Sequence, residues 1–484
     1  MQTKPHVVVV GGGVSGLTAA YRLSRAGAGV TVLESAPRLG GKLAASPVAG
    51  VPVDAGAESV LRRRPEALAL ISDLGLDDRV AHPAPVPASI YSRGRLRAFP
   101  EGQMMGVPGD LAALARSGVL STPGLLRAAA DLVLPPTPVQ GDVSVAAHIG
   151  RRMGAEVVDR LVEPLLGGVY AGRADRLSLR ATLPQIAELA QGGRSLARAV
   201  RDAKARQAAA PGGSGPVFAT LRGGLATLID ALAEQSGAEI RTSCPVRELR
   251  REGASWAVTA GPPDAPRHIT ADGVVLACTA SAASRILGPV APTAAGELAA
   301  IEYASMAIVT LAYPASAFTR PPEGSGFLVP SREGRTIKAA TYSSIKWPWL
   351  GEALAAAHPG GGMVLLRASI GRFGEEAVLE RDDAELAALA AADLADICGV
   401  GGTPAERRVT RWEEGLPQYV TGHSDRVGRA RAALADSPDL VLCGAAYDGV
   451  GIPACIAGAE TAADGLAAHL AGDRRSPRPT GPTP

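Results

Sequence analysis

The stretch VVVVGGGVSGLTAAYRLSRAGAGVTVLE, residues 7–34, decides the fold. Four valines predict a buried strand, a Gly-x-Gly-x-x-Gly turn follows, apolar residues recur at helical spacing, and a second β-rich run ends in a carboxylate. Gly11 permits the tight turn, Gly13 lets the backbone approach a pyrophosphate, and Gly16 lets the helix pack against the sheet. Glu34 stands 18 residues beyond Gly16, where this arrangement hydrogen-bonds a ribose hydroxyl. The stretch therefore predicts a dinucleotide-binding unit.

The residues that follow indicate which dinucleotide binds. In SAPRLGGK, residues 35–42, the adjacent glycines Gly40 and Gly41 lie between Arg38 and Lys42. Paired glycines let backbone amides approach phosphate oxygens, and the two cations favour negative charge there. Glu34 argues against a ribose 2′-phosphate, and an ordinary NAD dehydrogenase would not need this run. The combination resembles the FAD-binding signature of the amine-oxidase-like flavoprotein superfamily, which implies FAD.

Composition excludes several classes of function. The chain of 484 residues is long enough for two or three domains, and its net charge of +2 gives no electrostatic reason to expect a nucleic-acid partner. Five cysteines are scattered without a CxxC pair or a Cys/His cluster, and the seven histidines form no HExxH motif. We therefore expect reduced, buried thiols and no metal site.

The sequence also bears on membrane association. Met1 leads almost directly into the first strand, so we expect no signal peptide. The most apolar stretch, residues 118–136, is interrupted by Pro123, Arg127 and Asp131, so we expect no transmembrane helix. The cytoplasm is the expected location, and peripheral contact with a membrane surface stays open.

Alternating patterns divide the chain into segments. Alanine-rich helical patterns dominate residues 65–201, and β-rich runs return from residue 239 onward. We expect an α/β fold, α+β overall, that combines a discontinuous Rossmann-like FAD-binding domain, a mixed-sheet substrate domain and a mostly helical insertion. The expected bounds are 1–60, 215–290 and 408–472 for the first, 61–90 and 291–407 for the second, and 91–214 for the third. Residues 473–484 lack apolar content and are expected to be disordered.

A second cofactor signal lies near the C-terminus. LVLCG, residues 440–444, predicts a buried strand, and AAYDGVGI, residues 445–452, predicts a loop rich in small residues. The helix expected over residues 454–470 begins after this loop, so it presents free amides and the positive end of its dipole. Such a helix start suits a flavin edge or a phosphate and predicts the closing part of the FAD-binding domain.

Several runs resemble the oxygen-dependent porphyrinogen oxidases of haem synthesis. They are EPLLGGVYAG (163–172), LRGGL (221–225), KWP (346–348), LPQY with GH (416–419 and 422–423), and GVGIPACI (449–456). The resemblance extends over nearly the whole chain, and the first and last runs are specific to this family within the superfamily. Many relatives have proline where Ala57 stands and aspartate where Ala454 stands, and alanine at both positions should keep the backbone path.

The resemblance implies a set of cofactor-binding residues distributed over the chain. The pyrophosphate and ribose would contact Gly11, Gly12, Gly13, Val14, Ser15, Gly16, Glu34 and Ser35. The RxGGK run and the loop after residue 55 would contribute Arg38, Gly40, Gly41, Lys42, Gly56, Ala57, Glu58 and Ser59. The adenine would meet Val246, and the isoalloxazine region would meet Trp412, Gly444, Ala445, Val450, Gly451 and Ile452.

The reaction implied is oxidation of a porphyrinogen, in which six electrons leave in three two-electron steps and oxygen reoxidises the flavin to give hydrogen peroxide. No histidine–acid constellation indicates a dedicated acid or base, so the catalytic residues remain unknown. The substrate carboxylates need cations, and Arg62, Arg63 and Arg64 are the first candidates, with Arg173 and Lys346 after them. An arginine run is also typical of a solvated surface.

The resemblance to the actinobacterial branch, together with the lack of a membrane segment, favours coproporphyrinogen III, which carries four propionates. The alternatives are a protoporphyrinogen IX oxidase, a flavin amine oxidase or carotenoid desaturase, and a flavin-free lipid carrier related to GDP-dissociation inhibitors. Transient contact with ferrochelatase stays open.

Overall fold

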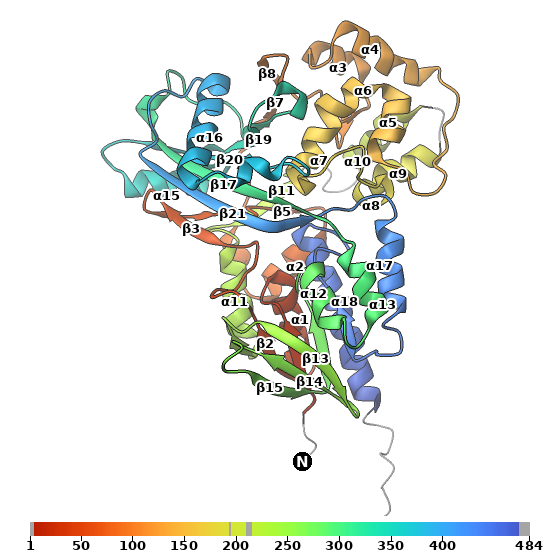
Figure 1. Cartoon of the computed structure of the whole chain (residues 1–484). Coiled ribbons are helices and arrows are strands. Elements are labelled where there is room, and N and C mark those ends of the chain that lie inside the picture. Colours follow the sequence, from red (N-terminus) through yellow and green to blue (C-terminus); the bar gives the residue numbers. More distant parts are fainter. Residues whose placement is uncertain (1–3, 193–194, 210–214, 474–484) are drawn as a thin grey trace, which may run out of the picture.

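A parallel sheet built around the four valines forms the lower half of the molecule in Figure 1. The computed structural model describes residues 4–192, 195–209 and 215–473, so residues 474–484 of the predicted disordered tail lie outside it. The sheet has the order β12-β2-β1-β16-β22. Its strands are β12 (Glu239–Arg241), β2 (Gly29–Leu33), β1 (His6–Val10), β16 (Gly273–Leu276) and β22 (Leu440–Leu442).

Both faces of this sheet are covered, which is why β1 is an uninterrupted apolar run. Val7 and Val9 pack into one core and Val8 into another. The first core includes residues of α1 (Val14–Arg25), α2 (Pro65–Asp73), α11 (Ala226–Gln235) and α18 (Ile452–Asp473). The second includes residues of a three-stranded sheet and three helices: β13 (Val246–Glu252), β14 (Ser255–Ala260), β15 (Arg267–Ala271), α12 (Ala280–Leu287), α13 (Pro292–Ala299) and α17 (His423–Ala432).

A seven-stranded sheet lies above the first, on the left of Figure 1. Its order is β21-β17-β20-β19-β18-β7-β8. The strands are β21 (Glu406–Pro417), β17 (Tyr303–Pro314), β20 (Met363–Ile370), β19 (Ile337–Tyr342), β18 (Gly326–Leu328), β7 (Ala88–Ser92) and β8 (Arg95–Ala98). α16 (Asp383–Cys398) packs on one face through a core that includes Leu386 and Leu394. Polar side chains on the opposite face reach the cofactor-side loop described below.

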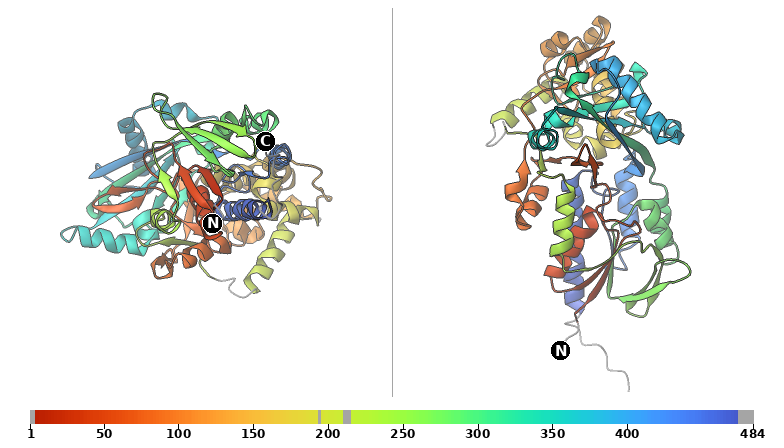
Figure 2. Two further views of the ribbon diagram at one scale, coloured as in Figure 1. Left: turned by 90° about the horizontal axis from the view of Figure 1, so that it is seen from below. Right: turned by 90° about the vertical axis from the view of Figure 1, so that its left-hand side faces the viewer.

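A helical segment occupies the upper right of Figure 1, and the right-hand view of Figure 2 shows it beside the seven-stranded sheet. Its helices are α3 (Leu111–Ser117), α4 (Thr122–Ala129), α5 (Val145–Met153), α6 (Ala155–Val157), α7 (Glu163–Tyr170), α8 (Leu179–Thr182), α9 (Pro184–Gln191) and α10 (Leu196–Ala209). A short π-helix, Val158–Val162, joins α6 to α7. The segment has its own apolar core, which includes Ile149 and Leu161.

The predicted α/β class is confirmed, and the sheets divide the chain at residues that differ from the predicted bounds. α2 shares the core of α1 and α18, although it falls in the predicted substrate segment 61–90. Strand β21 pairs with β17, so the segment predicted to be FAD-binding from residue 408 begins inside the seven-stranded sheet. β7 and β8 bring residues 88–98 into that same sheet. These pairings join residues far apart in sequence, which local patterns do not reveal.

Candidate functional site

The glycine turn combines two tightly packed glycines with one that is open. Gly11 has a φ of +109°, and a Cβ on it would lie 2.7 Å from the carbonyl oxygen of Ala277. A Cβ on Gly16 would lie 1.9 Å from the Gly11 oxygen, so the first turn of α1 can pack there only with glycine. A Cβ on Gly13 would meet no atom within 4 Å. The packing of the protein itself therefore does not require glycine at this position.

Glu34 ties the end of β2 to this turn. One carboxylate oxygen accepts a hydrogen bond from the amide of Gly12 at 2.7 Å, and the other accepts one from the amide of Ala36 at 2.7 Å. The oxygen that accepts from Gly12 keeps a second lone pair, so the carboxylate can also accept from a ribose hydroxyl. Ser35 donates its hydroxyl to the same carboxylate at 3.3 Å.

The RxGGK run is held against the glycine turn. The Gly40 amide donates to the carbonyl of Gly12 at 2.8 Å, and Arg38 donates to the carbonyl of Gly41 at 2.9 Å. The guanidinium of Arg38 lies 5.6 Å from the centroid of the Trp412 ring. Lys42 is largely buried, and this burial lowers the pKa of its ammonium group. A buried lysine beside a glycine turn suits an anionic ligand.

The loop of residues 56–59 lies between this run and the seven-stranded sheet. The Ala57 amide donates to the carbonyl of Lys42 at 3.1 Å, and a Cβ on Gly56 would lie 2.0 Å from the same oxygen. Trp412 donates its indole N–H to the carbonyl of Ala55 at 3.0 Å. The structure therefore brings the predicted residues of the RxGGK run, this loop and Trp412 together.

A buried charge cluster fixes the loop to the sheet. Glu58 accepts hydrogen bonds from Lys346 at 2.5 Å and from Arg367, which also donates to the Gly56 carbonyl at 2.6 Å. Burial alone would raise the pKa of Glu58, but the two cations outweigh it and hold the pKa at about 2. Lys346, predicted as a substrate cation, is thus paired with Glu58.

Asp54 joins the LRGGL run to this cluster. Its carboxylate accepts the amide of Leu225 at 2.9 Å, and a Cβ on Gly224 would lie 2.8 Å from the same oxygen. Burial raises the pKa of Asp54 to about 7, although the nearby Arg367 opposes the shift. Gly224 therefore lets the chain pass over a buried carboxyl group.

The remaining cofactor-side residues come from two other parts of the chain. The Cys244 amide donates to the carbonyl of Glu34 at 2.8 Å, which places Val246, at the start of β13, near the end of β2. The loop of residues 444–452 lies between β22 and α18. An added Cβ on Gly444 would have the Ser15 hydroxyl oxygen as its neighbour at 4.0 Å. The C-terminal loop thus approaches the glycine turn, as expected for the closing part of one site.

The structure does not gather the other predicted substrate cations at one place. Arg62 donates to the carbonyl of Pro216 at 3.2 Å, Arg64 pairs with Glu66, and Arg173 pairs with Asp175. Arg63 is exposed and has no hydrogen-bond or ion-pair partner among residues 4–192, 195–209 and 215–473.

The sequence patterns did not point to two cationic residues of the seven-stranded sheet. Arg367 is one, and Lys338 in β19 is the other. The Lys338 ammonium donates to the carbonyl of Gly371 at 2.7 Å and lies 3.9 Å from the sulfur of Met306. Burial, together with the charge of the neighbouring Arg372, lowers the pKa of Lys338 to about 7. In the sequence, each of these residues stands as a single cation in an apolar strand, and that pattern does not predict which groups the cation contacts.

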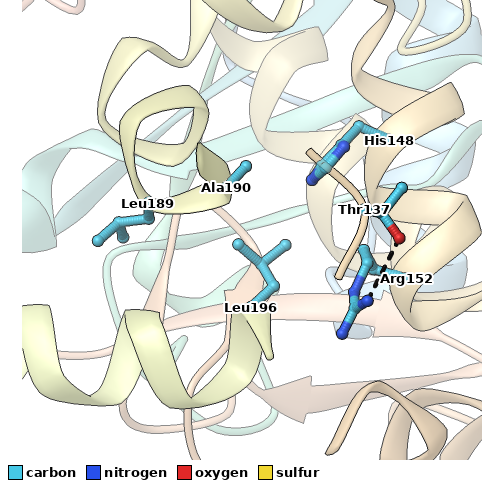
Figure 3. Close-up of a pocket in the computed structure, with 6 residues that line it drawn as sticks. All are labelled: Thr137, His148, Arg152, Leu189, Ala190 and Leu196. Carbon is cyan, nitrogen blue, oxygen red and sulfur yellow. Dashed lines mark hydrogen bonds between the residues drawn. The ribbon is translucent and has the colours of Figure 1, made fainter. Parts of the chain in front are cut away.

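Two hollows among the described residues lie elsewhere. Figure 3 shows a cavity of about 10 Å³ in the helical segment, where Thr137, His148 and Arg152 face Leu196. That volume suits a single water molecule. A groove of about 690 Å³ is lined by residues of β22 and α18, together with Arg431 of α17 and Asp448 of the loop before α18. Among the described residues we find no cluster of side chains suited to a metal ion and no helix long and apolar enough to cross a membrane.

Comparison with known proteins assigns the chain to a family. Residues 14–467 match the model of the flavin containing amine oxidoreductases. The chain belongs to that family. Its curated relatives include the coproporphyrinogen III oxidase of Mycobacterium tuberculosis, which is 40% identical over 93% of this chain and 95% of the relative. The coproporphyrinogen III oxidase of Bacillus subtilis is 32% identical over 94% of this chain and 96% of the relative.

A solved structure supports the assignment of this flavoprotein. A crystal structure from Exiguobacterium, assigned provisionally as a protoporphyrinogen oxidase, superimposes with a TM-score of 0.84 at 32% identity. It covers 97% of this chain and all of the other. The protein is an oxidoreductase with FAD as its cofactor. The open cradle at Gly13 and the buried amine of Lys42 fit this cofactor.

Proposed function

We propose that this flavoprotein oxidises coproporphyrinogen III to coproporphyrin III in haem biosynthesis. The observation that carries the proposal is the 40% identity to a coproporphyrinogen III oxidase over 93% of the chain. The EPLLGGVYAG and GVGIPACI runs support it, because both resemble runs of the porphyrinogen oxidases. We propose that the first run borders the substrate and that the second borders the flavin. A protoporphyrinogen IX oxidase is the second candidate, supported by the likeness to the Exiguobacterium structure.

The substrate loses six hydrogen atoms in this reaction, in three steps that each remove two electrons. Each pair of electrons leaves with two protons, and three molecules of oxygen become three of hydrogen peroxide. Bound FAD supplies the hydride acceptor and the reactivity with oxygen. The protein would position the substrate and orient the cofactor.

The residues proposed to hold FAD are those that the structure gathers around the glycine turn. The turn and Glu34 would hold the pyrophosphate and the ribose, and Lys42 would provide positive charge beside them. Val246 would meet the adenine, and the loops of residues 56–59 and 444–452 would border the flavin. Arg367, Glu58 and Lys346 act one layer further out, since they fix the loop of residues 56–59 to the sheet.

For the substrate carboxylates we propose Arg63 as the first cation to test. The other members of the run are held by Pro216 and Glu66, and Lys346 is held by Glu58. A free guanidinium can form a bidentate hydrogen bond with a propionate. Arg63→Ala should raise KM for coproporphyrinogen III several-fold and leave kcat unchanged, because the interaction is the same in ground and transition states.

Anaerobic mixing tests the proposed function. Coproporphyrinogen III should bleach the flavin absorbance near 450 nm, and admitting oxygen should restore it with formation of coproporphyrin III and hydrogen peroxide. The same mixing with protoporphyrinogen IX should be much slower. A large preference for protoporphyrinogen IX would select the second candidate, and bleaching by polyamines without any porphyrin product would contradict both.

The proposal extends to partners and location. Molecular oxygen is the proposed electron acceptor, and the cytoplasm is the proposed location. Ferrochelatase is a proposed transient partner, because the product is a free porphyrin that an iron-inserting enzyme could receive. Pull-down of a ferrochelatase on the immobilised holoprotein, in the presence of coproporphyrin III, checks the last point.

A further inference from the structure

Two adjacent buried residues connect the EPLLGGVYAG run to the C-terminal loop of residues 444–452. Gln418 and Tyr419 follow β21 and are 1% and 3% exposed. The Gln418 side-chain amide donates to the carbonyl of Tyr170, the last residue of α7, at 2.7 Å. The Tyr419 hydroxyl donates to the carbonyl of Ala445 at 2.8 Å. One residue therefore contacts the EPLLGGVYAG run, and its neighbour contacts the C-terminal loop.

The Tyr419 hydroxyl uses both its donor and its acceptor on the same loop. It accepts a hydrogen bond from the amide of Gly449 at 2.7 Å while it donates to Ala445. Burial raises the pKa of Tyr419, so the hydroxyl keeps its proton and the donor role. A single oxygen thus bridges two backbone positions on either side of Asp448. This bridge fixes the backbone that leads into residues 450–452.

The ring of Tyr419 is also held in place. It stacks on His423 with the ring centroids 3.9 Å apart, and the Tyr170 ring lies 5.7 Å away at a tilt of 50°. The pKa of His423 is lowered to about 4 by burial, so the imidazole is neutral at physiological pH. Stacking against a neutral ring leaves the tyrosine with one orientation toward the loop.

The Gln418 contact with α7 is equally tight. A Cβ on Gly172 would lie 2.5 Å from the side-chain oxygen of Gln418, so the end of the EPLLGGVYAG run packs directly on this amide. The Ser178 amide donates to the carbonyl of Tyr419 at 2.8 Å, and the Thr421 amide donates to the carbonyl of Arg176 at 3.1 Å. The segment of residues 418–421 is therefore bonded to the helical segment along its length.

We propose that Tyr419 is a positioning residue for the flavin-side loop, and that Gln418 and Tyr419 couple this loop to α7. The inference rests on the proposed function, in which residues 450–452 border the flavin and α7 borders the porphyrinogen. A shift of α7 on substrate binding would then act on the loop through two adjacent residues. The LPQY run thus links the EPLLGGVYAG run to the GVGIPACI run.

Tyr419→Phe tests the first half of the proposal, because it removes the hydroxyl and keeps the stacked ring. We expect FAD to bind about tenfold more weakly, as the loss of two hydrogen bonds predicts, and the visible absorbance of the bound flavin to shift. Tyr313→Phe is the matched control, since Tyr313 is a buried tyrosine in the core beside α16. Equal FAD affinity and an unchanged absorbance in Tyr419→Phe, relative to Tyr313→Phe, would overturn the proposal.

Gln418→Met tests the coupling to α7. This variant keeps the length of the side chain and removes the bond to Tyr170, so KM for coproporphyrinogen III should rise several-fold while FAD affinity stays unchanged. The double variant with Tyr419→Phe should depart from additivity, and additive effects on kcat/KM would overturn the coupling. If the wild-type holoprotein oxidises no porphyrinogen, the proposed function fails, whereas FAD affinity and absorbance still decide the role of Tyr419.

Discussion

The carboxylate of Glu58 and the ammonium of Lys346 lie 2.5 Å apart, with side chains that are 13% and 17% exposed. Arg367 shares the same carboxylate and is 6% exposed. The cluster therefore carries two cations and one anion inside the protein. Because water cannot screen these charges, each of them depends on its partners. The loop of residues 56–59 depends on the cluster for its position.

Glu58→Gln should destabilise the fold by about 3–5 kcal/mol, because it leaves two buried cations without their counter-charge. Urea unfolding at pH 7 measures the change in free energy. Glu66→Gln is the control, since the Arg64–Glu66 pair is more exposed, with Arg64 at 46%, and should contribute less than about 1 kcal/mol. Equal losses in the two variants would contradict the role of burial.

The contribution of Glu58 should also depend on pH in a defined window. Its folded pKa of about 2 lies below the ordinary value of 4.5, so the folded state holds the proton less tightly than the unfolded state. The stabilisation is therefore complete above pH 4.5 and is lost as the pH falls toward 2. The difference in unfolding free energy between wild type and Glu58→Gln should shrink over that window, and a constant difference would contradict the assignment.

The glycine turn allows a test that separates folding from binding. Gly13→Ala should fold with unchanged thermal stability, because the added methyl group meets no protein atom within 4 Å. It should lose FAD, because the methyl group would enter the space that we propose for the pyrophosphate. Gly16→Ala should fail to fold stably, since its Cβ would lie 1.9 Å from the Gly11 oxygen. Absorbance near 450 nm reports FAD, and circular dichroism reports the fold. A Gly13→Ala protein that retains FAD would contradict the proposed cradle.

Gly13 and Gly16 belong to the part of the site that the sequence predicted. The pattern of residues 7–34 predicted the strand, turn, helix and strand, because each step depends on contacts between residues close in sequence. It also predicted Glu34 at the end of β2, where the carboxylate holds the turn. Local chemistry was sufficient for this part of the site.

The charge cluster could not be predicted in the same way. Arg367 stands in the apolar strand β20, and its partner Glu58 precedes it by 309 residues. Their contact depends on how the seven-stranded sheet lies over the loop of residues 56–59. The periodicity of the sequence does not predict this arrangement. Lys346 follows Glu58 by 288 residues, so the sequence did not reveal this pair either.

Asp54→Asn should change the pH dependence of stability near neutrality. The pKa of Asp54 is raised from 3.8 to about 7, so the folded state binds the proton more tightly and wild-type stability falls as pH rises through this range. Asparagine keeps an oxygen for the Leu225 amide and does not titrate. Thermal unfolding from pH 4 to 8 should show a flatter profile for the variant, and parallel profiles would contradict the shift.

Lys338→Met tests the buried lysine of β19. Its folded pKa of about 7 lies below the ordinary 10.5, so the unfolded state holds the proton more tightly between these values, and wild-type stability rises with pH across them. Methionine removes the buried charge, and the lost bond to the Gly371 carbonyl costs about 1 kcal/mol. The variant should therefore gain most over wild type below pH 7.

Urea unfolding at pH 6 and pH 10 measures this difference. The advantage of Lys338→Met should be largest at pH 6 and should shrink at pH 10, because the wild-type lysine is then neutral in the folded state. Lys4→Met is the control, since Lys4 is exposed, and it should change stability by less than about 0.5 kcal/mol at either pH. An advantage of equal size at both pH values would mean that packing, and not the charge of Lys338, determines the effect.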